Sequence, residues 1–116
     1  MGNPVAFFEV VSTQHEQAQR FYGDLFGWTV TADADGYGLV DTGAGPDAVG
    51  GGIGPSQTPG DTGVKVYVQV PDLQAALDRA EELGGKALVP PTDLPAGYGR
   101  FAILADPDGN PVGLWA

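Results

Sequence analysis

The fold is decided by the stretch Arg20-Phe21-Tyr22-Gly23-Asp24-Leu25-Phe26-Gly27-Trp28. Apolar residues recur at helical spacing from Ala18 into this stretch and stop at Gly27, a residue type that commonly ends helices. Thr13 and Glu16 have the spacing of a capping box, which marks the start of a helix. The sequence therefore predicts an amphipathic helix that begins near Thr13 and ends at Gly27.

The same pattern returns in the second half of the chain. The stretch Ala80-Glu81-Glu82-Leu83-Gly84-Gly85 ends a second apolar stripe, and Asp72 at its beginning is a favoured N-cap residue. A shift of 58 residues, half the chain length, places Ala18 on Ala76 and Leu25 on Leu83. We infer that the chain is a duplicated unit.

Runs of β-branched, aromatic and apolar residues between turn residues predict four strands in each half. They are Val5–Val11, Trp28–Thr31, Tyr37–Asp41 and about Ala48–Ile53, followed by Val64–Val70, Lys86–Val89, Gly99–Ala105 and Pro111–Trp115. The predicted fold class is α+β, with duplicated βαβββ modules that form a curved mixed sheet. One domain, 1–116, would contain repeat one at about 4–54, a linker at about 55–63 and repeat two at about 64–116.

Composition and charge restrict the partners. The chain has a net charge of -10 and no cluster of Lys or Arg, which argues against nucleic acid and membrane surfaces. It contains no cysteine, so disulfides, thiol nucleophiles and thiolate metal sites are excluded. We find no targeting signal or membrane span in the sequence and predict a cytoplasmic location.

Five stretches together resemble a known family. Two of them are the helix ends already quoted, Arg20–Trp28 and Ala80–Gly85. The other three are Phe8-Glu9-Val10-Val11, Val68-Gln69-Val70-Pro71-Asp72-Leu73 and Asp106-Pro107-Asp108-Gly109-Asn110-Pro111-Val112-Gly113-Leu114-Trp115. In this order they resemble the vicinal oxygen chelate superfamily, which includes glyoxalase I, fosfomycin and bleomycin resistance proteins, and extradiol dioxygenases. The resemblance implies the fold, whereas the family includes both enzymes and drug-sequestering proteins on that fold.

The resemblance also implies where a divalent metal would be bound. Enzymes of the family hold it with His, Gln or Glu from the first and last strands of each repeat. These positions correspond to Phe7, Lys65, Gly113 and a residue near Gly51, whose register is open. Phe and Gly have no side-chain donor and Lys is a cation, so we predict no metal and no cofactor.

Alternation along the strands places further residues beside these positions. If the ligand positions face a cleft between the repeats, the cleft is lined by aromatic residues and a few polar groups. The predicted ligand-binding residues are Phe7, Glu9, Lys65, Tyr67, Gln69 and Trp115. Arg100 precedes a strand that borders the cleft in relatives, so it is included as a partner for an anionic ligand.

Three functions remain open, and the sequence does not decide whether the protein is an enzyme. The first is metal-free binding of a small aromatic or amphipathic molecule. The second is a metal-dependent lyase or dioxygenase with other ligands, Glu9 among them. The third is a metal-free isomerase with Glu9 as base, assisted by Tyr67 or Lys65. A structural ion pair with Lys65 is the commonest outcome for a carboxylate in such a strand. The resemblance alone predicts a homodimer.

Overall fold

The computed structural model describes residues 2–56 and 62–116. The chain divides into two compact units, one spanning Phe7–Val64 and the other spanning Lys65–Ala116 together with the residues up to Ala6. We call them the first and the second repeat. Most of the predicted linker, at 57–61, lies outside the described residues.

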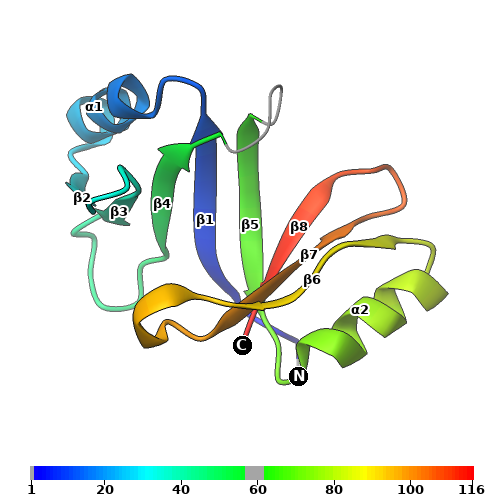
Figure 1. The fold of residues 1–116 in the computed structure, drawn as a ribbon. Coiled ribbons are helices and arrows are strands. Elements are labelled where there is room, and N and C mark those ends of the chain that lie inside the picture. The colour runs from blue at the N-terminus through cyan, green and yellow to red at the C-terminus, as the bar shows by residue number, and fades with distance from the viewer. Residues whose placement is uncertain (1, 57–61) are drawn as a thin grey trace. The chain divides into compact units, whose positions relative to one another are not determined.

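The first repeat has the predicted βαβββ order. Its elements are β1 (Val5–Ser12), α1 (His15–Phe26), β2 (Thr29–Ala32), β3 (Gly38–Asp41) and β4 (Gly50–Pro55). The strands lie in the order β2-β3-β4-β1 (Figure 1). β1 and β4 are parallel neighbours, whereas the pairs β2/β3 and β3/β4 are antiparallel.

The second repeat has the same arrangement. Its elements are β5 (Gly63–Gln69), α2 (Leu73–Glu82), β6 (Lys86–Asp93), the short 3-10 helix η1 (Pro95–Gly97), β7 (Arg100–Ala105) and β8 (Pro111–Trp115). The strand order is β5-β8-β7-β6, with β5 and β8 parallel and the other pairs antiparallel. The predicted α+β class and the duplicated βαβββ modules are therefore confirmed.

The two helices end as the sequence predicts, but only one begins so. Gly27 caps α1 in the left-handed conformation, with φ of 71°, and its N–H donates to the Gly23 carbonyl. The predicted capping box of Thr13 and Glu16 is wrong. α1 begins at His15, its N-cap residue is Gln14, and no side chain caps it. Ser12 Oγ instead accepts a hydrogen bond from the Gln14 N–H, at 3.0 Å.

α2 begins at the predicted N-cap. The Asp72 side chain accepts a hydrogen bond from the Ala75 N–H, at 3.0 Å, which satisfies one of the free amides of the first helical turn. The helix ends at Glu82, before Gly84 with its positive φ of 101°. Neither helix of the described chain is long and apolar enough to span a membrane.

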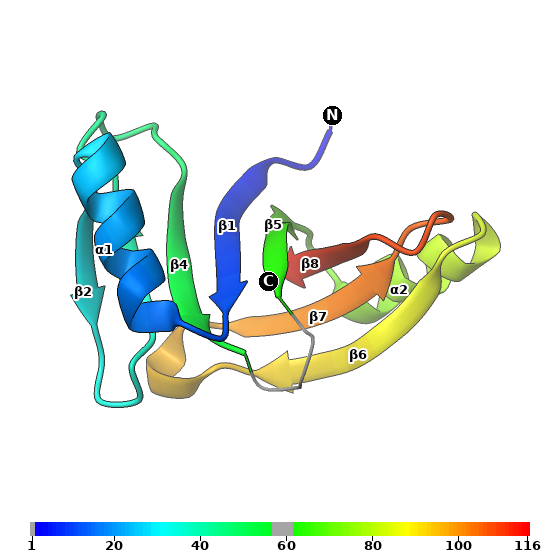
Figure 2. The same cartoon turned by 90° about the horizontal axis from the view of Figure 1, so that it is seen from above.

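Each repeat has its own hydrophobic core between its helix and its sheet. In the first repeat Val10, Val40 and Ile53 are buried beneath residues that include Tyr22 of α1. In the second, the buried residues are Val70, Leu73, Leu77, Ala102 and Leu114. Figure 2 shows α1 alongside β2 and β4, and Figure 1 shows α2 alongside β6 and β7. One face of each sheet is therefore covered by the helix of the same repeat.

The strand limits differ from the prediction mainly at β6. The sequence predicts that this strand ends at Val89, before Pro90 and Pro91, which cannot donate backbone hydrogen bonds. β6 continues to Asp93, with register shifts on either side of Val89. It lies at the outer side of β7 in its own repeat, where an edge strand tolerates proline.

Candidate functional site

The sheet of the first repeat has a helix-free face that carries two predicted site residues. Val10 is buried in the core on the α1 side of β1. Since successive side chains of a strand point to opposite faces, Phe7 and Glu9 lie on the other face. In the adjacent strands, Gly52 pairs with Glu9, and Leu39 pairs with Gly52. These residues form one row across the helix-free face.

The second repeat has an equivalent helix-free face. Val70 and Leu114 belong to its core, on the α2 side. Alternation therefore places Lys65, Tyr67 and Gln69 of β5 on the opposite face, together with Gly113 and Trp115 of β8. The predicted site residues of each strand therefore share a face within their repeat, and their role in ligand binding stays a prediction.

A hydrogen bond joins Glu9 to a residue that the sequence analysis missed. The Tyr37 hydroxyl donates to Glu9 Oε2 at a distance of 2.7 Å. Both side chains are partly buried, so part of each remains exposed to solvent. The pair combines a carboxylate acceptor with an aromatic ring, which are two groups that recognise small polar ligands.

The ring of Tyr37 lies against the glycines of β4. A side-chain carbon at Gly52 or Gly54 would come within 3.0 Å of several Tyr37 ring atoms. Only a strand without side chains on this face allows such an approach. The glycines therefore let the tyrosine hydroxyl reach over Gly52 to Glu9, the residue that pairs with Gly52.

A tight turn and a glutamine hold Tyr37 in place. Asp33 Oδ1 accepts hydrogen bonds from the N–H groups of Asp35 and Tyr37, at 2.9 and 3.0 Å. Gln19 Nε2 of α1 donates to the carbonyls of Gly36 and Ile53, at 2.9 and 2.8 Å. The turn before β3 is thereby tied to both α1 and β4.

The second repeat repeats this packing with a different tyrosine. A side-chain carbon at Gly113 would come within 3.0 Å of the Tyr67 ring. Tyr67 pairs with Gly113 as Glu9 pairs with Gly52. In each repeat a tyrosine ring therefore rests on the glycine of the last strand, supplied by β5 itself in the second repeat and by the turn before β3 in the first.

Arg100 lies elsewhere. It belongs to the same face of β7 as Ala102, which is buried in the core on the α2 side. Its Nε donates to Asp93 Oδ1 at 2.8 Å. Together with Asp72 and Gln74, it borders a hollow of about 370 Å³ at the beginning of α2. The structure does not bring Arg100 to the face that carries Tyr67 and Trp115.

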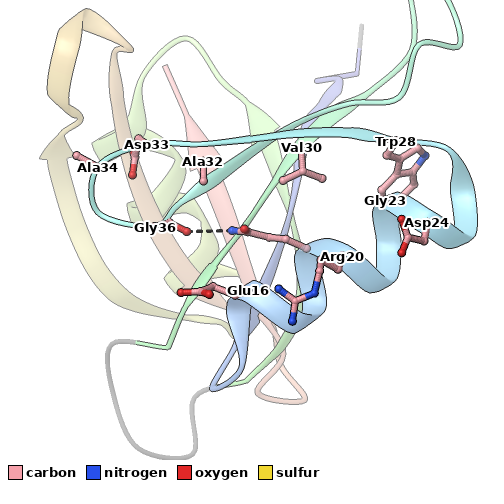
Figure 3. A pocket seen from close by; sticks show the side chains of 11 residues that line it. Glu16, Arg20, Gly23, Asp24, Trp28, Val30, Ala32, Asp33, Ala34 and Gly36 are labelled. Atoms are coloured by element: carbon pink, nitrogen blue, oxygen red, sulfur yellow. Dashed lines mark hydrogen bonds between the residues drawn. The ribbon is translucent and has the colours of Figure 1, made fainter.

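A larger groove, of about 590 Å³, lies between α1 and β2 (Figure 3). Its charged lining comes from Glu16, Arg20 and Asp24 of α1 and from Asp33. Gln19 and Gly36 also line it, joined by the hydrogen bond from Gln19 Nε2 to the Gly36 carbonyl, and Figure 3 draws the bond at Gly36 as a dashed line. The groove is on the helix side of the sheet and contains no predicted site residue.

The comparison with known families is decisive for the scaffold. A family model described as a glyoxalase-like domain matches residues 7–115, almost the whole chain. The chain belongs to the glyoxalase-like domain family. The predicted membership of the vicinal oxygen chelate superfamily is confirmed.

Individual relatives and solved structures agree. The chain is similar to the putative glyoxylase CFP32 of Mycobacterium tuberculosis, with 27% identity over 92% of this chain and 43% of that protein. It is 30% identical to the anthracycline biosynthesis protein DnrV of Streptomyces peucetius, over 95% of this chain and 46% of that protein. The chain therefore spans less than half the length of these two relatives.

A crystal structure supports the fold. A glyoxalase/bleomycin resistance protein/dioxygenase superfamily member from Vibrio splendidus 12B01 matches with a TM-score of 0.67. The match has 16% identity and covers 97% of both chains. At this identity the similarity concerns the fold of the glyoxalase-like chain and not its activity.

The metal positions implied by the glyoxalase-like family do not fit a metal in this chain. Gly52 pairs with Glu9 of β1 as Gly113 pairs with Tyr67 of β5, so Gly52 is the counterpart of Gly113. The metal position expected near Gly51 is therefore at Gly52. Gly51 itself is on the other face of the sheet, against the ring of Phe8. Gly52 and Gly113 have no donor atoms, and tyrosine rings occupy the space that a side chain there would need. The described residues also contain no group of three or more His, Asp or Glu side chains that could hold a metal ion.

The sequence contains a signal of a close approach to β4, although it does not identify Tyr37 as the residue that makes it. Gly50, Gly52 and Gly54 alternate at the period of a strand and leave one face without side chains. Such a strand indicates that a ring or a backbone approaches closely. The predicted ion pair between Glu9 and Lys65 would join the two repeats, and it stays a prediction.

Proposed function

We propose that this glyoxalase-like protein binds a small aromatic or amphipathic molecule on its helix-free faces, without a divalent metal at the family's ligand positions. One observation carries the proposal. The glycines at two of these positions, Gly52 and Gly113, are covered by the rings of Tyr37 and Tyr67. A metal-ligating side chain there would have to displace a packed ring.

The side chains of the helix-free faces support this ligand class. Phe7, Leu39 and Trp115 provide apolar surface, and Glu9 and Gln69 provide polar groups. Small-molecule sites in proteins typically combine apolar walls with a small number of polar groups. The relative DnrV is named an anthracycline biosynthesis protein, and this name is compatible with an aromatic ligand.

Elemental analysis and equilibrium dialysis test the proposal together. The protein is purified from medium supplemented with zinc, nickel, manganese and iron, and its metal content is measured. We expect much less than one metal ion per chain and saturable binding of aromatic compounds from a metabolite panel. One tightly held metal ion per chain would overturn the metal-free proposal, and failure of all aromatic compounds to bind would overturn the ligand class.

A second function is favoured by the hydrogen bond between Tyr37 and Glu9. A carboxylate that is oriented by a hydroxyl can serve as a general base in a metal-free isomerase. Glu9→Gln should then abolish turnover but preserve ligand binding. If the variant loses binding and turnover in parallel, Glu9 is a binding group.

We also propose that the protein is a homodimer. Phe21, Leu25 and Phe26 of α1 are each more than half exposed, and large apolar side chains on one helix commonly mark an interface. Light scattering should give twice the chain mass. Replacement of Phe21 and Leu25 by Ser should give a folded monomer, and a monomeric mass for the unmodified protein would refute the proposal.

A further inference from the structure

We infer that the open edge of β2 is a docking site for an extended peptide that carries two basic side chains four residues apart. The peptide would add to the sheet of the first repeat as a further strand, beside the groove of about 590 Å³ between α1 and β2. The inference goes beyond the proposed small-molecule site and does not depend on it, because it concerns the helix side of the sheet.

The backbone of β2 has hydrogen-bonding groups that point away from the sheet. Directly after the strand, the Asp33 N–H donates to the Tyr37 carbonyl at 2.9 Å, so the backbone groups of Asp33 point toward β3. In an antiparallel pair, residues that bond to the partner strand alternate with residues that point away from it. Since β2 pairs with β3 in regular register, Val30 and Ala32 direct their N–H and C=O groups outward. β3 is the only neighbour of β2 in the strand order of the described chain.

β2 lacks the sequence features that commonly protect an edge strand. Proline, lysine and bulges prevent a further strand from adding to an edge. β6, the outermost strand of the second repeat, contains Lys86, Pro90 and Pro91 and has register shifts in its pairing. β2 has no proline, no lysine and no register shift. Its four residues are therefore open to the addition of a short strand.

The groove gives room for side chains of the added strand. Val30 and Ala32, the two residues with outward backbone groups, also line the groove from β2 (Figure 3). Gly23 lines it from α1, and a side-chain carbon there would come to 3.2 Å from the Trp28 carbonyl oxygen. Helix and strand are thus in contact at this end of the groove. Side chains of an added strand that point to the helix side would lie along α1.

The charges of the groove favour basic side chains. Its lining contains the carboxylates of Glu16, Asp24 and Asp33 and one guanidinium group, that of Arg20. All four side chains are exposed, and none of them takes part in an ion pair with another described residue. The excess of carboxylates attracts cations and repels anions. A peptide with Lys or Arg facing α1 is therefore complementary to the groove.

The spacing of the charges determines the peptide pattern. Glu16 and Asp24 are eight residues apart on α1, a distance of about 12 Å along the helix axis. Side chains on one face of a strand recur every second residue, so two of them four residues apart are separated by about 13 Å. Lys at these two positions matches Glu16 and Asp24. An uncharged residue between them avoids repulsion by Arg20, which lies midway between the two carboxylates in the helix sequence.

Two peptides of identical composition test the inference. They are acetyl-Thr-Lys-Val-Gln-Val-Lys-Thr-amide, with both Lys on one face of a strand, and acetyl-Thr-Lys-Val-Gln-Lys-Val-Thr-amide, with the two Lys on opposite faces. Each is synthesised with a fluorescent group at one end, and binding to the full chain is measured by fluorescence anisotropy. Equal charge makes their general attraction to a chain of net charge -10 the same. We expect the first peptide to bind about fourfold more tightly, because the second loses one ion pair.

Variants separate the backbone contribution from the charges. Ala32→Pro removes an N–H that points away from β3, so the pairing with β3 remains and the affinity for the first peptide should fall at least about fivefold. Asp24→Asn should lower the affinity about fourfold, whereas Arg20→Gln should raise it. Glu81→Gln removes a carboxylate from the exposed surface of α2 and should have no effect. Circular dichroism verifies the fold of each variant.

Each outcome supports or overturns the inference. Equal affinity for the two peptides would contradict the predicted spacing and can be established on the unmodified protein even if Ala32→Pro does not fold. Unchanged binding to a folded Ala32→Pro variant would exclude strand addition. If neither peptide binds, the docking site is wrong and the proposed small-molecule site is unaffected. A dimer that Ala32→Pro converts to a monomer would assign the edge of β2 to a second copy of the chain instead of a peptide.

Discussion

Gly52→Ala tests whether the ring of Tyr37 depends on the bare backbone of β4. The new methyl group would come closer than 3.0 Å to the tyrosine hydroxyl and to two ring carbons. Both partners are held, because β4 is hydrogen-bonded to β1 and β3 and the turn before Tyr37 is tied to Gln19. The ring therefore has to move away from Glu9.

The expected decrease in the free energy of unfolding of Gly52→Ala follows from three contributions. Overpacking of a held side chain costs about 1–3 kcal/mol. The lost hydrogen bond between Tyr37 and Glu9 adds roughly 1 kcal/mol. The reduced freedom of the unfolded chain in Gly→Ala offsets about 0.4–1 kcal/mol. We expect a net loss of about 2 kcal/mol, which corresponds to a Tm lower by roughly 8 °C in a domain of this size.

Urea unfolding followed by circular dichroism measures this loss. Gly50→Ala is the matched control, since Gly50 is on the same strand and face and its nearest neighbour would be the Val40 carbonyl oxygen at 3.2 Å. Tyr37→Ala combined with Gly52→Ala should cost less than the sum of the single changes, because the clash disappears with the ring. A fully additive pair, or a Gly52→Ala variant as stable as the parent, would refute the packing argument.

Three further predictions concern the anchors of the fold. Gln19→Ala removes the donor to the Gly36 and Ile53 carbonyls and should lower the free energy of unfolding by about 2 kcal/mol, measured by urea titration. Asp72→Ala removes the cap of α2 and should cost about 1 kcal/mol, whereas Asp72→Asn should cost much less; thermal melting compares them. The hydrogen bond from the Asn110 side chain lowers the pKa of Asp106 from its ordinary value of 3.8. Its stabilising contribution is complete above pH 3.8 and is lost as the pH falls through the lowered pKa, so Asp106→Asn should flatten the acid limb of the stability curve.

The order of elements could be predicted because it depends on short-range patterns. The helices have apolar stripes and glycine ends, and β8 at Pro111–Trp115 was predicted to the residue. The start of α1 could not be predicted from Thr13 and Glu16, because the chain enters the helix through a bond from Gln14 to Ser12 instead. A local capping pattern does not specify the path of the chain between the preceding strand and the helix, and this path determines where the helix begins.

The faces of the site could be predicted, but not its contacts. Alternation along β1 and β5 was sufficient to group Phe7 with Glu9 and Tyr67 with Gln69. The partner of Glu9 is 28 residues away in the sequence, and its approach depends on the absence of side chains in another strand. Such a contact requires the three-dimensional register of β1, β3 and β4, which no local pattern specifies.

The two rings on β4 also protect the chain from misfolding. β4 contains a single large side chain, Ile53, among four glycines, so in its own sequence only the burial of that residue opposes slippage by one position. Phe8 contacts Gly51 on one face, and Tyr37 contacts Gly52 and Gly54 on the other. A slip by one residue would push Ile53 into one of these rings. The two aromatic side chains thus disfavour the shifted registers of β4 by steric clash.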